Sequence, residues 1–293
     1  MKDFPIPVVA AFVGPGSQAE DETLDYLPMP SGMATYSAPR LPEPEALAGH
    51  DGAVQALRAA LAALDGARRG GSTLRVSLAG LAAADLALVN QVLGEGEVSA
   101  VVRGPAQPEG SGDEVRVQES VFAGVWRVMH LHDGRIVDDV IELGAVPRAL
   151  RDAAAADADP VAPRWQGALP PGVQNAPALL AEIEDQWRTW RPDRPAHVVN
   201  LTLLPMSPQD IAFLDHHLGT GRVLFLSRGY GNCRITNTRM PNCWRVVYYN
   251  SQDVVILNTV EVTGLPEVAQ AAREDLDDSH ERLAEVLAWV EQA

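Results

Sequence analysis

Both cysteines of the chain, Cys233 and Cys243, lie in the segment GYGNCRITNTRMPNCW. Two thiols near glycines and arginines are compatible with a metal or redox site, with a phosphate-binding loop, or with ordinary strands. The spacing of the cysteines lacks the close ligand pairs of zinc sites. The segment also lacks the Gly-x-x-x-x-Gly-Lys pattern of a phosphate-binding loop. We therefore expect two packed strand residues, which can also be cross-strand neighbours in a hairpin. An iron, iron–sulfur or redox role is the alternative.

A basic and aromatic corner next to the first cysteine is the second candidate. Its members are Arg228, Gly229, Tyr230, Gly231, Asn232 and Arg234. Arginine and tyrosine are typical anchors of protein interfaces, so we predict that this corner binds a protein partner. A structural turn and a small-molecule site are the alternatives. The sequence contains no Gly-x-Ser-x-Gly, His-Glu-x-x-His or dinucleotide-binding glycine pattern, which favours a protein that is not an enzyme.

Two similar stretches, ADLALVNQVLGEGEV and QDIAFLDHHLGTGRV, indicate an internal repeat. At an offset of 125 residues, Asp85 aligns with Asp210 and Gly96 with Gly221. Apolar residues recur at i, i+3 and i+7 in both stretches, a spacing that predicts a helix in each. Both aspartates fall in the first helical turn, where the helix dipole favours an anion. We therefore expect a structural role for them.

The alignment continues beyond these helices at an offset of 118 residues. There Cys233 aligns with Val115 and Cys243 with Val125, which supports the packed-thiol interpretation. Trp126 aligns with Trp244 within a sequence that alternates between apolar and polar residues, a pattern typical of strands.

Two glutamates, Glu142 and Glu261, occupy aligned strand ends. They are compatible with a symmetric pair of functional carboxylates. We expect instead that each forms a salt bridge with the arginine of its own unit, Arg127 or Arg245.

Each repeat is predicted to contain a helix, a strand, a second helix and about four strands. The expected fold is α+β: two tandem repeated units with mixed or antiparallel sheets, an irregular N-terminal arm and a C-terminal helix. The predicted boundaries are an arm over 1–50, a first unit over 51–156, a proline-rich linker over 157–177, and a second unit over 178–293. Whether the two units pack as one pseudo-symmetric domain stays open.

The composition excludes several classes of protein. The formal net charge is −16, whereas nucleic-acid binding requires a basic surface. Two cysteines in 293 residues do not form a disulfide framework, so we expect a cytoplasmic protein. No apolar stretch approaches the roughly 20 residues of a membrane span. The short apolar run near the N-terminus begins with two prolines and does not resemble a signal peptide.

The segment from LSRGYGNCRI to VILNTVEV resembles the HupH/HyaF/HoxQ family of accessory proteins for uptake nickel–iron hydrogenases, as do the N-terminal GPGSQ and LDYLPMPSGMATY sequences. The resemblance spans nearly the whole chain. It implies a non-catalytic assembly chaperone without a cofactor. The implied partners are the hydrogenase small-subunit precursor, which carries iron–sulfur clusters and an export signal, and a thioredoxin-like accessory protein of the HyaE/HoxO type. The alternative is a redox or iron–sulfur delivery protein that uses Cys233 and Cys243. Formation of a homo-oligomer also stays open.

Overall fold

The computed structural model describes residues 49–103, 111–159, 167–228 and 232–292. The predicted N-terminal arm therefore lies almost entirely outside the described residues, as does the middle of the predicted linker. The described residues form two compact units. The first comprises those of Gly32–Asp152 together with Val268–Ala293, and the second comprises those of Ala153–Glu267. Helix α3, Arg148–Asp157, contains the boundary between them.

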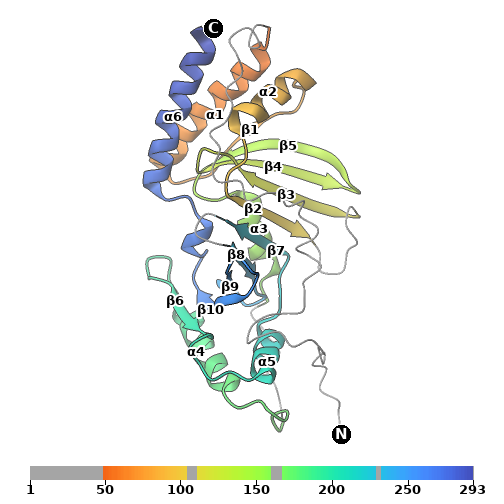
Figure 1. The fold of residues 1–293 in the computed structure, drawn as a ribbon, viewed down its shortest axis with the longest axis vertical. Helices are drawn as coiled ribbons and strands as arrows, with labels where there is room; N and C mark the ends of the chain where they lie inside the picture. Colours follow the sequence, from red (N-terminus) through yellow and green to blue (C-terminus); the bar gives the residue numbers. More distant parts are fainter. Residues whose placement is uncertain (1–48, 104–110, 160–166, 229–231, 293) are drawn as a thin grey trace. The chain divides into compact units, whose positions relative to one another are not determined.

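The first unit begins with a helix, a strand and a helix, followed by consecutive strands (Figure 1). These elements are α1 (Asp51–Gly70), β1 (Leu74–Ser77), α2 (Ala83–Leu93), β2 (Val98–Arg103), β3 (Asp113–Glu119), β4 (Val125–His132) and β5 (Arg135–Leu143). The strands are ordered β1-β5-β4-β3-β2, and each neighbouring pair is antiparallel. Asp133 and Gly134 have positive φ and form the tight turn between β4 and β5.

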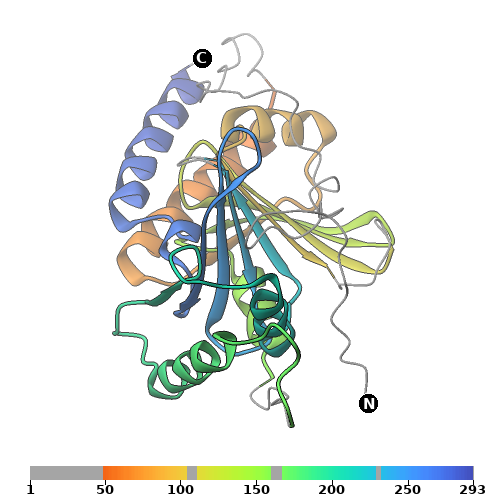
Figure 2. The ribbon, with the colours of Figure 1, turned by 60° about the horizontal axis from the view of Figure 1, so that its bottom comes forward.

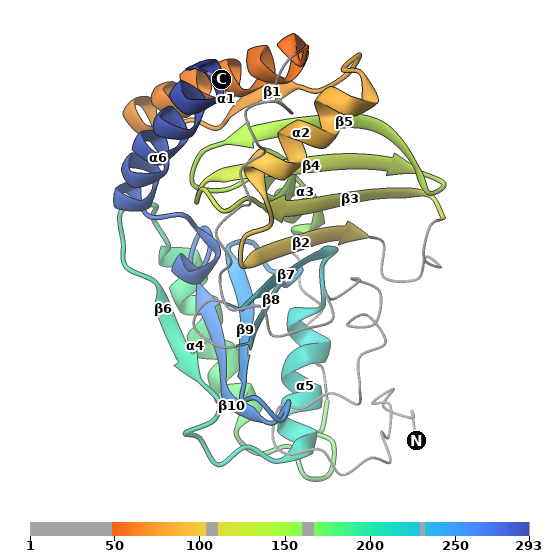
Figure 3. The same ribbon diagram turned by 45° about the horizontal axis from the view of Figure 1, so that its top comes forward.

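The last helix of the chain, α6 (Arg273–Gln292), belongs to the core of the first unit. It lies beside α1 (Figure 3). Its apolar stripe, including Leu276, Leu283 and Leu287, is buried in one cluster with α1, α2, β4 and β5. The predicted boundaries put this helix in the second unit, 178–293. The difference arises because an apolar stripe shows that a helix packs, but does not show which sheet it packs on.

The second unit has its own helices and strands. They are α4 (Ala176–Thr189), β6 (His197–Asn200), α5 (Pro208–Leu218), β7 (Val223–Ser227), β8 (Asn232–Asn237), β9 (Cys243–Tyr249) and β10 (Val255–Val262). The strands are ordered β6-β10-β9-β8-β7 and are again antiparallel. Helices α4 and α5 share a core with β6, β9 and β10, and Figure 2 shows both helices in front of these strands.

The α+β class is confirmed, and within each unit the strand pairs are antiparallel rather than mixed. The internal repeat stays a prediction. Among the helices that the structure describes, none combines the length and the low charge that a membrane span requires.

The predicted salt bridge between Arg127 and Glu142 is wrong. In the β4–β5 pair, Glu142 lies opposite Trp126, whereas Arg127 lies opposite Ile141. Neighbouring residues of a strand point to opposite faces, so Arg127 and Glu142 lie on different sides of the sheet. Arg127 instead binds Asp139, with Nη2 and Oδ2 2.7 Å apart.

The same correction applies in the second unit. Glu261 lies opposite Trp244, and Arg245 lies opposite Val260. The Arg245 Nη1 binds Oδ1 of Asp215 on α5 at 3.0 Å. The aligned arginines therefore bind residues of their own faces, and neither bridges to the aligned glutamate.

Candidate protein-binding site

The two cysteines lie at opposite ends of the β8–β9 hairpin. Cys233 lies opposite Tyr248, whereas Cys243 starts β9 and lies opposite Val262 of β10. The register of the hairpin separates them by five residue positions, roughly 17 Å at the rise of a strand. Cys233 shares a face with Trp244, whose neighbour Cys243 points to the other face. The expectation that the cysteines are cross-strand neighbours is therefore wrong.

Both thiols are buried. Cys233 is 3% exposed and Cys243 is 2% exposed. Burial raises the pKa of both thiols to about 12, although hydrogen bonds with Tyr248 and Thr238 act to lower it. A thiol binds metal or attacks a disulfide as the thiolate, which these pKa values disfavour at neutral pH. Among the described residues, no three His, Cys, Asp or Glu side chains form a group that could hold a metal ion.

We expect Cys233→Val to change the free energy of unfolding by less than about 1.5 kcal/mol, because the swap nearly conserves volume and valine already occupies the aligned position 115. Denaturant unfolding measures the change in stability that the packed-thiol interpretation predicts. The iron content of anaerobically purified protein tests the alternative of an iron-binding role. Cys243→Val is the matched variant at the other end of the hairpin. Iron that is present in the unmodified protein and absent from either variant would contradict the packed-thiol interpretation.

The predicted corner lies at one end of the second unit's strands. Arg228 is exposed and directly follows β7, and Asn232 is exposed and starts β8. Arg234 is half-buried and lies opposite Val247 of β9. Gly229, Tyr230 and Gly231 lie outside the described residues.

The β9–β10 connection reaches the same end of the strands. Asn232 lies opposite Tyr249, the last residue of β9, so the start of β8 and the end of β9 lie side by side. Two apolar residues lie at this end of the strands, Val254 and Ile256, with 55% and 54% of their surface exposed. Large aliphatic side chains exposed to this extent are candidate contacts for a partner.

Local hydrogen bonds fix the direction of this second connection. The Asn250 side chain accepts hydrogen bonds from the backbone N–H of Gln252 at 2.8 Å and of Val254 at 3.0 Å. Asp253 has φ +57°, and the register shifts between Val255 and Leu257. The turn and the bulge are therefore ordered features, and they hold Val254 in place.

A third exposed apolar residue, Leu203, follows β6 at the same end. The chain after β6 continues along β10, because Leu201 N donates to Asn258 O at 2.9 Å and Asn258 N donates to Thr202 Oγ1 at 2.8 Å. Leu203 is 80% exposed. We call Arg228, Asn232, Arg234, Leu203, Val254 and Ile256 the hairpin-end surface.

Sequence reasoning found the polar part of the hairpin-end surface and missed its apolar part. A signal was present: Val254 and Ile256 lie in the run DVVILN directly after a turn, where strand residues are less covered than in the middle of a sheet. Leu203 carried no such signal, because its place beside β10 depends on the pairing of β6 with that strand.

The chain is similar to hydrogenase expression proteins over nearly its whole length. The model of the C-terminal conserved region of the HupH hydrogenase expression protein matches residues 52–166 and 173–290. The hydrogenase expression/formation protein HoxQ of Cupriavidus necator is 57% identical over 293 residues, 99% of each chain. The hydrogenase expression/formation protein HupH of Rhodobacter capsulatus is 48% identical, over 98% of each chain.

Two further matches are more distant. The hydrogenase-1 operon protein HyaF of Escherichia coli is 33% identical over 286 residues, 96% of each chain. A solved structure of the hydrogenase expression protein HupH from Thiobacillus denitrificans is 28% identical, with a TM-score of 0.37. That match covers 39% of this chain and 95% of the other.

Proposed function

The chain belongs to the HupH hydrogenase expression protein family, and we propose that it is a non-catalytic assembly factor that binds the small-subunit precursor of an uptake nickel–iron hydrogenase in the cytoplasm, before export. The names of its relatives, expression/formation proteins, support a role in forming a hydrogenase. The small subunit as partner follows from the family resemblance. A thioredoxin-like accessory protein of the HyaE/HoxO type is the second proposed partner.

The hairpin-end surface is the observation that carries the proposal of a binding role. Exposed aliphatic side chains lose contact with water when a partner covers them. This burial favours binding by about 25 cal/mol for each Å² of apolar area. Leu203, Val254 and Ile256 supply that area, and Arg228 and Arg234 lie toward the same end of the strands. The buried core of an interface is more apolar than the rest of a protein surface, and arginine is enriched in interfaces.

The proposal requires no chemistry from the chain. The thiols are buried, and Asp210 accepts backbone hydrogen bonds from Gln174, Asn175 and Ala176, as a structural carboxylate does. We therefore assign binding, not a reaction, to the second unit.

Anaerobic binding of the purified chain to the small-subunit precursor tests the proposal. We expect the double variant Val254→Ser with Ile256→Ser to bind about tenfold more weakly, a loss of about 1.4 kcal/mol of binding free energy. The matched control is Ile136→Ser with Val137→Ser on β5 of the first unit, where the same residue types are 53% and 66% exposed. If the two double variants bind with equal affinity, the hairpin-end surface is not the binding site. If the unmodified chain does not bind, the small-subunit precursor is not the partner.

We also propose that the two units are diverged copies of one ancestral unit. In support, each has the order helix, strand, helix and four strands, and each places its first strand beside its last. The family model also matches two separate stretches of the chain, 52–166 and 173–290. A crystal structure of the full chain tests this proposal: the units are not copies if the helices and strands of one do not superpose, in chain order, on those of the other.

A further inference from the structure

A groove of about 340 Å³ lies between α1 and α6 of the first unit. Leu61 and Ala62 of α1 and Leu287 of α6 are its aliphatic residues. Ala62 is exposed and has the smallest side chain that a residue with a Cβ can have, so it leaves room that a partner's side chain can fill. The apolar part of the groove suits an aliphatic group.

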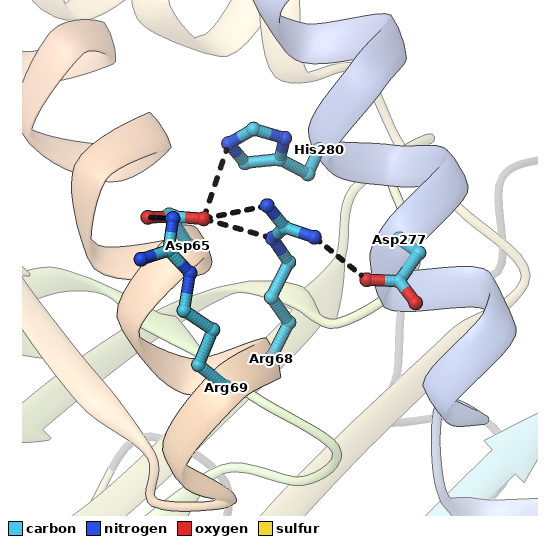
Figure 4. A network of polar contacts seen from close by, with 5 residues as sticks. All are labelled: Asp65, Arg68, Arg69, Asp277 and His280. Atoms are coloured by element: carbon cyan, nitrogen blue, oxygen red, sulfur yellow. Dashed lines mark hydrogen bonds and ion pairs between the residues drawn. The ribbon is translucent and has the colours of Figure 1, made fainter.

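One carboxylate, Asp65, is shared by two arginines and a histidine in this groove (Figure 4). Its oxygens lie 2.7 Å from Arg68 Nη2, 2.5 Å from Arg69 Nη2 and 3.8 Å from His280 Nε2. Burial raises the pKa of Asp65, but hydrogen bonds from Arg68 and Arg69 outweigh this and lower it below its usual value. Arg68 also binds Asp277, at 3.0 Å.

The lining of the groove is more basic than the chain as a whole, although Arg68 also pairs with Asp277. The chain has 23 basic and 39 acidic residues, whereas the groove is lined by three arginines and a histidine around one aspartate. The third arginine, Arg58, precedes Asp65 by two turns of α1, roughly 10 Å along the helix axis. Arg69, at the other end, keeps 70% of its side chain exposed although it binds Asp65.

We propose that the α1–α6 groove binds an acidic amphipathic helix of a partner protein. The aliphatic residues of such a helix would cover Leu61, Ala62 and Leu287, and carboxylates about three turns apart would meet Arg58 and Arg69. An apolar stripe laid into a groove between helices is a common mode of peptide recognition. This site is in the first unit, so it does not depend on the hairpin-end surface.

The probe is a fluorescein-labelled helical peptide of 18 residues, a length of about 27 Å, with a leucine stripe between glutamates about eleven residues apart. We expect saturable binding that weakens as salt rises, and at least about tenfold weaker binding by the double variant Arg58→Glu with Arg69→Glu. Arg148→Glu is the control, because Arg148 is 73% exposed and binds an aspartate four residues away, as Arg69 does. A double variant that binds as tightly as the control would overturn the proposal.

A second pair of variants tests the apolar part of the groove. Ala62→Leu should fill the groove and weaken binding severalfold, whereas Ala59→Leu, at an exposed position of α1 outside the lining, should not. Leucine is a good helix former, so both variants should fold. The proposal fails if Ala62→Leu binds normally. It also fails if phosphatidylserine vesicles or a single-stranded oligonucleotide bind at this groove and the peptide does not.

Discussion

Gly96→Ala is expected to lower the free energy of unfolding by about 3 kcal/mol, because a methyl group at this position meets backbone that cannot move aside. A Cβ on Gly96 would lie 2.2 Å from the carbonyl oxygen of Ser120 and 3.1 Å from that of Glu119. Gly96 N donates to Glu119 O at 2.7 Å, so the close approach is part of the hydrogen bonding that joins α2 to β3 and its turn. Relief of the clash would break this bond.

Gly70→Ala is the control for the effect of an added methyl group. Nothing lies within 4 Å of a Cβ on Gly70, the last residue of α1. Alanine is favoured over glycine in a helix, so we expect a change of less than about 1 kcal/mol, of either sign. Denaturant unfolding of both full-length variants measures the difference. Equal stabilities would show that the contact between Gly96 and Ser120 is not tight in solution.

The sequence predicted the elements well because their signals are local. The Gly-x-Gly pairs end two helices, and the alternation around Trp126 and Trp244 predicted two strands, β4 and β9. The cap of α5 is equally local: Ser207 Oγ accepts a hydrogen bond from Asp210 N at 2.9 Å, as part of a capping box. Each of these features depends on residues a few positions apart.

The missed features depend on contacts between distant parts of the chain. The partners of Arg127 and Arg245 are set by which face of the sheet each side chain occupies, and an alignment of the repeats does not show this. The site of α6 is set by an apolar cluster that includes Leu57 and Leu64 of α1, more than 200 residues away in the sequence. The hairpin-end surface required the register of β8, β9 and β10.

The aligned aspartates each have one feature that the sequence predicted and one that it could not predict. The sequence predicted a structural role near a helix start for Asp85 and Asp210. In the structure the side chain of each aspartate also contacts the start of the helix that precedes its own in the chain. Asp85 Oδ1 lies 3.0 Å from His50 Nδ1 before α1, and Asp210 accepts from Ala176 N, the first residue of α4, at 3.0 Å. Both contacts join residues more than 30 positions apart, so the local spacing of residues could not reveal them.

The second large effect is expected at Asp210, where Asp210→Ala should lower the free energy of unfolding by about 3 kcal/mol near neutral pH. Its carboxylate is 1% exposed. Oδ1 accepts from the backbone N–H of Gln174, Asn175 and Ala176 at 2.8 to 3.0 Å, and Oδ2 accepts from Ser207 N at 3.1 Å. Removal of the carboxylate leaves these donors without their charged acceptor.

The pH dependence identifies the cause of this loss. Burial raises the pKa of Asp210, but hydrogen bonds from backbone N–H groups outweigh this and lower the pKa from 3.8 to about 2. A carboxyl whose pKa is lower in the folded state stabilises the fold above pH 4, and the stabilisation disappears as pH falls toward 2. The shift corresponds to about 2 kcal/mol. The free energy of unfolding of the unmodified chain should therefore exceed that of Asp210→Asn by about this amount at pH 6. The difference should shrink between pH 4 and pH 2.

Asp85→Asn separates this effect from the general loss of a charge near a helix start. Asp85 occupies the aligned position, but its described hydrogen-bond partner is the His50 ring rather than a row of backbone N–H groups. A half-exposed side-chain contact of this kind contributes about 1 kcal/mol or less, so Asp85→Asn should be the milder variant above pH 4. If the two variants lose equal stability, or if the loss for Asp210→Asn does not change with pH, the charge of Asp210 is not what holds α4 to α5.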